Sequence, residues 1–199
     1  MASHATRDMV DELFTKLASD SQRLVKIFVG DSEHPVHLQQ SVLEGISGYF
    51  IGAFAEGRFE EGRSGILRLP EDNIEVWKII VTWIVNRAVP EDLLRTDLLL
   101  AIRCWITGDK YDIKEFQDAV MLCILAELVS DGVKLNIEMI KVSFEETPVD
   151  SPLREVIVNR RMSEYDLKGF EEKTKHEEMW ILDGTGFLPL LESKNKLGF

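Results

Sequence analysis

The sequence predicts an α+β fold, and three observations support this class. The chain has 199 residues, of which 45% are hydrophobic, enough to bury the core of one domain or of one domain with an appendage. Its extended segments, rich in branched and aromatic residues, all lie within the first 70 residues. From residue 72 onwards, the apolar residues recur at helical spacing.

The first predicted element is a short amphipathic helix over residues 7–19. Its apolar residues recur at spacings of three and four and form one stripe. The stripe consists of Met9, Val10, Leu13, Phe14 and Leu17. Because so short a helix is marginal by itself, we expect the stripe to pack on another surface.

Three strands are predicted next. The first, Leu24–Val29, stops at a Gly-Asp turn, and Val36–Gln39 returns as the second strand of a hairpin. The third, Ile66–Leu69, ends at a proline. Between them we expect a short helix opened by a capping box of Ser41 and Glu44, a second short helix capped by Ser47, and a charged loop over 57–65.

The remaining elements are predicted helices. A capping-box-like pattern over 72–75 opens the first, and Thr96-Asp97 opens the next. The helix over 113–128 is apolar almost all round, which predicts a centrally buried position. Another follows over 136–145, and Ser151-Pro152 is a strong start signal for the last, a cap followed by proline. In the tail, Trp180 and Phe187 either pack inward or, if exposed, mark a groove for a partner, and we favour packing.

Composition argues against several classes of function. Lys and Arg total 23 against 35 Asp and Glu, a net charge of −12, which disfavours direct nucleic-acid binding. Two helical cysteines, Cys104 and Cys123, fit a reducing compartment. Without a long apolar run or a signal-like start, we expect no membrane contact and an intracellular protein, in the nucleus or the cytoplasm.

No constellation of residues typical of an enzyme is present. The four histidines, His4, His34, His37 and His176, have no metal-ligand spacing with cysteines or carboxylates. Cys123 is flanked by apolar residues, the opposite of what a nucleophile needs. We therefore expect no catalysis, no cofactor and no metal.

The order of these motifs resembles a BTB/POZ domain. The resemblance covers about residues 24–128, with 1–23 as an N-terminal helix and 129–199 as a C-terminal helical extension. The motifs are VKIFVG (25–30), VLEGISGYFIGAF (42–54), GRFEE (57–61), ILRLPED (66–72) and GDKYDI (108–113). The segment ETPVDSPLREVIVN (146–159) resembles the extension of many filamentous-fungal members.

The resemblance implies a small three-stranded sheet flanked by helical hairpins and a role in protein–protein assembly. Two positions depart from the usual pattern. Gln39 stands where most members have a histidine, and Leu24 where an aspartate is common. Those polar residues help to build a charged pocket at the dimer interface of the transcription-factor branch, so their absence argues against corepressor recruitment of that type.

Self-association is the first function that the resemblance implies. In the family an N-terminal helix packs across the partner subunit, and the stripe defined above occupies the matching place. The alternative is that the helix folds back on its own domain, which buries the same stripe. We favour a homodimer, because two-fold dimers are the commonest soluble assembly.

The second is contact with a cullin. Adaptor members carry a hydrophobic–any–acidic triplet before the third strand, which Phe59, Glu60 and Glu61 match. The alternative is that Phe59 packs into the local core. The loop from Phe54 to Phe59 is one residue longer than usual. No client-binding module is recognisable, so the helices after Asn136 or a hetero-partner would have to supply it.

The resemblance thus implies an adaptor or scaffold that homodimerises through its N-terminal helix and a sheet edge, with cullin-3 as candidate partner and an unidentified client protein. The alternative is a dimerising subunit of a nuclear regulatory complex without a ligase role.

Overall fold

The computed structural model describes residues 11, 14–15, 23–55, 57–130, 133–164 and 177–196. The chain forms two compact units. The first comprises Met1–Lys78 with Tyr111–Lys114, and the second comprises Ile79–Lys110 with Glu115–Phe199. Of the predicted N-terminal stripe, Phe14 is described and is 71% exposed. The other members, Met9, Val10, Leu13 and Leu17, lie outside the described residues.

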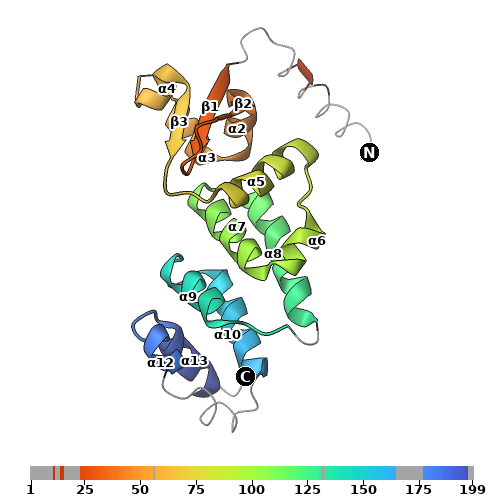
Figure 1. Cartoon of the computed structure of the whole chain (residues 1–199), viewed down its shortest axis with the longest axis vertical. Helices are drawn as coiled ribbons and strands as arrows, with labels where there is room; N and C mark the ends of the chain where they lie inside the picture. The colour runs from red at the N-terminus through yellow and green to blue at the C-terminus, as the bar shows by residue number, and fades with distance from the viewer. Residues whose placement is uncertain are drawn as a thin grey trace. The chain divides into compact units, whose positions relative to one another are not determined.

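The first unit contains a mixed three-stranded sheet, so the predicted α+β class is confirmed. Strands β1 (Leu24–Val29), β2 (Val36–Gln39) and β3 (Ile66–Leu69) have the predicted bounds. Their order is β2-β1-β3 (Figure 1). β1 pairs antiparallel with β2, as the hairpin requires, and parallel with β3, which the chain reaches only after three intervening helices.

Three short helices separate β2 from β3. Helices α2 (Gln40–Ile46) and α3 (Gly48–Phe54) follow the hairpin, and their Leu43, Phe50 and Phe54 are buried with the inward residues of the sheet. The predicted loop over 57–65 contains a further helix, α4 (Glu60–Ser64), which ends at Gly65 in the left-handed region. Two glutamates in its first turn and an arginine in its last turn interact favourably with the helix dipole and so stabilise the helix.

The caps of α2 and α3 differ in origin. Ser47 caps α3 as predicted, since its hydroxyl accepts a hydrogen bond from the Tyr49 amide at 3.1 Å. The predicted capping box of α2 is wrong. That helix starts after Gln39, which gives no side-chain cap, and the Glu44 carboxylate instead accepts a hydrogen bond from Gln40.

Helices make up the rest of the described chain. Helix α5 begins in the first unit, and the others belong wholly or almost wholly to the second. They are α5 (Ile74–Asn86), α6 (Glu91–Thr96), α7 (Leu98–Lys110), α8 (Lys114–Val129), α9 (Ile137–Glu145), α10 (Pro152–Glu164), α12 (Glu177–Leu182) and α13 (Phe187–Lys196). The predicted starts at Asp97 and Asn136 are confirmed, because both side chains accept an amide hydrogen bond at 2.9 Å. Helix α6 was not predicted.

Two packing predictions in the second unit need correction. Helix α8 was expected to be buried all round, but one of its faces, with Leu122, Leu125 and Val129, is exposed. Phe187 packs as expected, with its ring perpendicular to that of Phe144 at 5.2 Å. Trp180, in contrast, is 84% exposed. The apolar pattern of α8 does not distinguish its faces, and only tertiary contacts decide which of them is covered.

The start of α10 depends on Arg154 more than on Ser151. The Ser151 hydroxyl is buried and has no hydrogen-bond partner in the described part of the chain. The buried Arg154 guanidinium donates to the carbonyls of Phe144 and Thr147 and, at 3.1 Å, to the Thr147 hydroxyl. These bonds join the end of α9 to the first turn of α10, so the predicted helix start is correct while the expected cap is not.

Substitution of Ser151 tests this difference. A capping serine would cost about 1 kcal/mol of stability when replaced by alanine. A buried hydroxyl without a partner carries an uncompensated desolvation cost, so we expect Ser151→Ala to raise stability by up to about 1 kcal/mol. Urea unfolding measures this, with Asn136→Ala as the control that loses a genuine cap. Equal destabilisation by both variants would contradict the structure.

Candidate functional site

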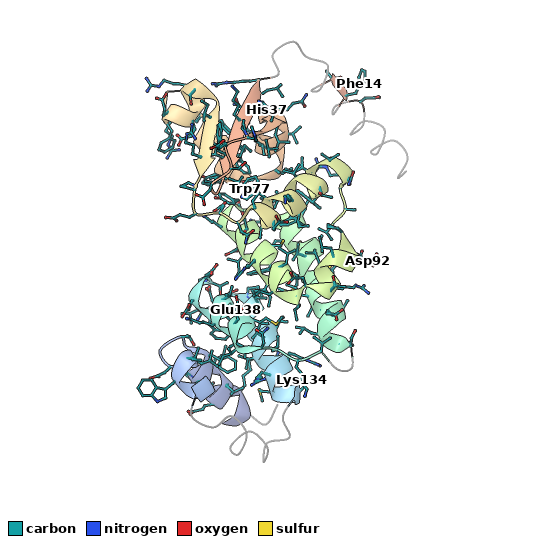
Figure 2. All side chains as sticks on the ribbon, viewed as in Figure 1. Phe14, His37, Trp77, Asp92, Lys134 and Glu138 are labelled. Atoms are coloured by element: carbon teal, nitrogen blue, oxygen red, sulfur yellow. The ribbon has the colours of Figure 1, made fainter. Side chains whose placement is uncertain are left out.

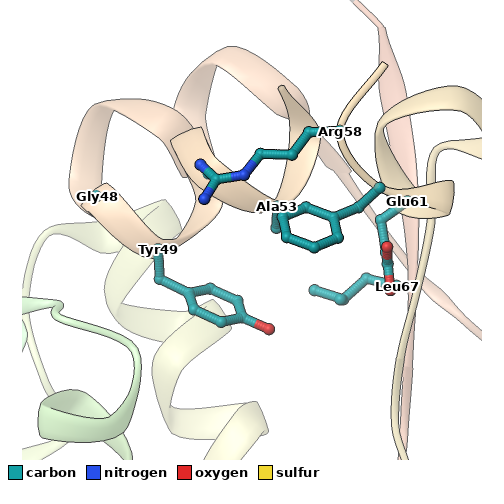
Figure 3. Close-up of a pocket in the computed structure, with 8 residues that line it drawn as sticks. Gly48, Tyr49, Ala53, Arg58, Glu61 and Leu67 are labelled. Carbon is teal, nitrogen blue, oxygen red and sulfur yellow. The ribbon is translucent and has the colours of Figure 1, made fainter. Parts of the chain in front are cut away.

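A hollow of about 390 Å³ opens on the first unit, between α3, α4 and β3 (Figure 3). We call it the α3–α4 hollow. Its lining residues are Gly48, Tyr49, Gly52, Ala53, Arg58, Phe59, Glu61 and Leu67. The wall is mostly apolar, and Arg58 and Glu61 supply the charged groups at its rim. A concave apolar surface with few polar groups is the usual form of a binding site.

Small residues on α3 keep the hollow open. A Cβ atom at Gly52 would meet nothing within 4 Å, so larger residues there would fill the space. Gly62 on α4 has the opposite role, because a Cβ there would lie 2.6 Å from the carbonyl oxygen of Ala55. The α4 backbone therefore packs directly on the turn after α3, which fixes where the residues just before and inside α4 project.

Two of the three residues of the predicted triplet, Phe59 and Glu61, line the hollow. Phe59 immediately precedes α4 and is 49% exposed, so it is not part of the buried core. The Arg58 guanidinium lies 5.2 Å from the centre of its ring. Glu61 lines the hollow beside Phe59, whereas Glu60 does not line it and forms an ion pair with Arg63. The structure thus brings the two outer residues of the triplet together.

An aromatic cluster supports the opposite wall. The Tyr49 ring, which lines the hollow, packs edge-on against Tyr111 at 4.9 Å and Phe50 at 5.3 Å. Tyr111 and Trp77 are also in edge contact, at 5.6 Å. The Ser47 hydroxyl, which caps α3, donates to the Tyr111 carbonyl. The same side chain therefore starts α3 and fixes it to the Tyr111 segment.

The Asp72 carboxylate holds this cluster together. Its Oδ2 accepts hydrogen bonds from the Tyr111 hydroxyl at 2.6 Å and from the Trp77 indole at 2.7 Å. The sequence pattern had assigned Asp72 to the start of α5, but Asn73 does this instead, accepting from the Glu75 amide at 2.8 Å. Burial, reinforced by the bond to Asp72, raises the pKa of Tyr111 well above its usual range, so the phenol remains a donor.

The two thiols are held in their neutral form. Burial, with a smaller effect from the Asp97 charge, raises the pKa of Cys104 to about 12. Burial also raises the pKa of Cys123. Within the ranges that the structure describes, no group of three or more His, Cys, Asp or Glu residues could hold a metal ion. No helix in those ranges is long and apolar enough to cross a membrane.

Comparison with known proteins adds no relative to this picture. No protein-family model matches the chain, and no curated protein matches it at a significant level.

Removal of the Asp72 carboxylate tests its structural role. Asp72→Ala leaves the Tyr111 and Trp77 donors without their acceptor, so we expect a loss of about 2–3 kcal/mol in unfolding free energy. Chemical denaturation monitored by circular dichroism measures it. Asp31→Ala, at an exposed turn position, is the matched control and should change stability by less than about 0.5 kcal/mol. Similar values for the two variants would contradict the proposed role of Asp72.

Proposed function

We propose that the chain is a BTB/POZ-type protein-interaction module that homodimerises and acts as an adaptor or scaffold without catalysis. Its candidate partner is the N-terminal domain of a cullin-type ubiquitin ligase. The element order supports the class: an antiparallel hairpin, two short helices, a third strand on the central one, and then helices. The observation that carries the binding proposal is the half-exposed Phe59 beside Glu61 at the α3–α4 hollow.

Phe59 has the properties of an interface anchor. Aromatic residues dominate binding energy where they lose solvent contact completely on association, and about half of this side chain is still available to a partner. The guanidinium of Arg58 near its ring restricts the ring before binding, which lowers the entropy lost on association. The Glu61 carboxylate can attract a basic partner surface and fix its register.

The position of Phe59 supports the same proposal. The longer connection from Phe54 could have carried the aromatic ring away from the acidic residue. Instead the backbone contact of Gly62 with Ala55 sets α4 close to the turn, and Phe59 stands at the start of that helix. Both outer residues of the triplet thereby line one hollow.

Dimerisation is proposed through the N-terminal stripe. Phe14 is 71% exposed in the single chain, which favours packing on a partner subunit over folding back. A stable interface buries about 1,600 Å² in total, and one amphipathic helix with a neighbouring surface can supply this area.

Light scattering on a sizing column tests the dimer. We expect the wild-type protein to have twice the chain mass of 22.7 kDa. Phe14→Asp places a charge in the stripe that the proposed dimer would bury, and it should give the monomer mass at the same concentration. Thr15→Asp adds the same charge off the stripe and should leave the dimer intact. A monomeric wild type, or a dimer in both variants, would exclude this interface.

The cullin contact is tested by adding the purified N-terminal domain of cullin-3. We expect a stoichiometric complex that both Phe59→Ala and Glu61→Lys weaken by at least about tenfold, a loss of about 1.4 kcal/mol or more. Ile51→Ala is the matched control, since Ile51 is an exposed apolar residue of α3 that does not line the hollow. A dimer that ignores cullin would favour a scaffold without a ligase role.

A further inference from the structure

We propose that the outer face of the sheet is a second protein-binding surface, which takes an acidic segment of a partner protein. This outer sheet face shares no residue with the lining of the α3–α4 hollow or with the N-terminal stripe. It consists of the outward residues of the three strands, namely Leu24, Lys26, Phe28, His37, Gln39, Ile66 and Arg68.

The strand register brings Lys26 and His37 together. On β1, Val25, Ile27 and Val29 are buried, so the alternate residues point outward. Lys26 lies opposite His37 in the antiparallel pair and opposite Ile66 in the parallel pair. Side chains directly opposite each other in an antiparallel pair have Cβ atoms about 5 Å apart. Figure 2 labels His37 on β2, at the edge of this face.

A further basic residue, Arg68, lies on the same face, two residues along β3 from Ile66. It is the β3 partner of Phe28, and its guanidinium lies 4.3 Å from the centre of the Phe28 ring. A guanidinium stacked on a ring keeps its N–H edge free for a carboxylate while its face is occupied. The stacking therefore presents Arg68 in an orientation suited to an acidic ligand.

None of the described residues that form this face is acidic. Across the described ranges, no carboxylate forms an ion pair with Lys26, His37 or Arg68. This is unusual in a chain with 35 Asp and Glu residues and a net charge of −12. Opposite charges across strands stabilise a sheet and like charges destabilise it. Basic residues without acidic partners therefore contribute no ion-pair stabilisation to this sheet. Sequence choices of this kind are expected at functional sites.

Apolar residues on the same face indicate a protein partner. Leu24 is 59% exposed, and Phe28 and Ile66 are partly exposed beside the cations. A partner segment with carboxylates next to an apolar side chain would match both features. A nucleic acid would also bring negative charge, but the surrounding protein is strongly acidic and would repel a long polyanion.

Fluorescence anisotropy with the full chain tests this surface. The probe is a fluorescein-labelled peptide in which Asp and Glu alternate with Leu, compared with the same peptide carrying Asn and Gln. We expect the acidic peptide alone to bind, more weakly as salt is raised. Lys26→Glu with Arg68→Glu should weaken binding by at least about tenfold, because two charge-assisted contacts are lost.

The matched control is Lys114→Glu with Lys141→Glu. It makes the same change in net charge at two cations that already have acidic neighbours, at 3.5 Å and 3.8 Å. This control should leave peptide affinity within about twofold. Amide NMR shifts of the wild-type protein on addition of peptide should map to Lys26, Phe28, His37 and Ile66, a readout that needs no folded variant.

Several outcomes would overturn the proposal. Equal binding of the acidic and amide peptides, equal losses in the two double variants, or no binding of the acidic peptide would each exclude this surface. Binding of a single-stranded oligonucleotide in place of the peptide would identify a different partner class. Concentration-dependent self-association that the Lys26/Arg68 variant abolishes would identify a second copy as the occupant. Because Phe59→Ala should retain peptide binding, failure of the cullin proposal is distinguishable from failure here.

Discussion

The hydrogen bonds to the Asp72 carboxylate are the interaction on which the first unit depends. A single oxygen accepts from Trp77, in the first turn of α5, and from Tyr111, which is 39 residues away in the sequence. Tyr111 in turn binds the Ser47 hydroxyl through its carbonyl. These bonds therefore connect three parts of the chain through the Asp72 carboxylate and Tyr111: the segment after β3, the start of α3, and the Tyr111 segment itself. In a partly buried setting such charge-assisted bonds are short and directional, which makes this arrangement specific as well as stabilising.

The same network limits the conformational freedom of the walls of the α3–α4 hollow. Tyr49 belongs both to the aromatic cluster and to the hollow, so the side chains that bind Asp72 also restrict one wall of the candidate site. The other wall depends on α4, whose approach is fixed by a backbone contact. A surface held from both sides loses little entropy when a partner docks, and this pre-organisation is often what separates a binding site from an ordinary depression.

The fold was predictable wherever the signal is local. All three strands have their predicted bounds, with Gly30 directly after β1 and Pro70 directly after β3, and Ser47 and Asn136 cap their helices as the sequence indicates. Prediction failed where a distant partner decides. Asp72 and Ser151 read as helix caps, yet one binds two aromatic donors and the other has its hydroxyl buried. The resemblance named Phe59 as a candidate, whereas the hollow and its aromatic wall depend on contacts between remote segments, which no local pattern reveals.

The close approach at Gly62 has an evolutionary consequence. The contact joins backbone to backbone, and the Arg23 guanidinium also donates hydrogen bonds to the Gly62 and Arg63 carbonyls, so these restraints on α4 use none of the side chains that line the hollow. Arg58, Phe59 and Glu61 can therefore change without moving the helix that presents them. Selection could alter the chemistry of this surface, and with it the choice of partner, by single substitutions on an unchanged frame. Gly62 itself is the position where we expect selection to remove substitutions first, because any side chain there would clash with the Ala55 carbonyl.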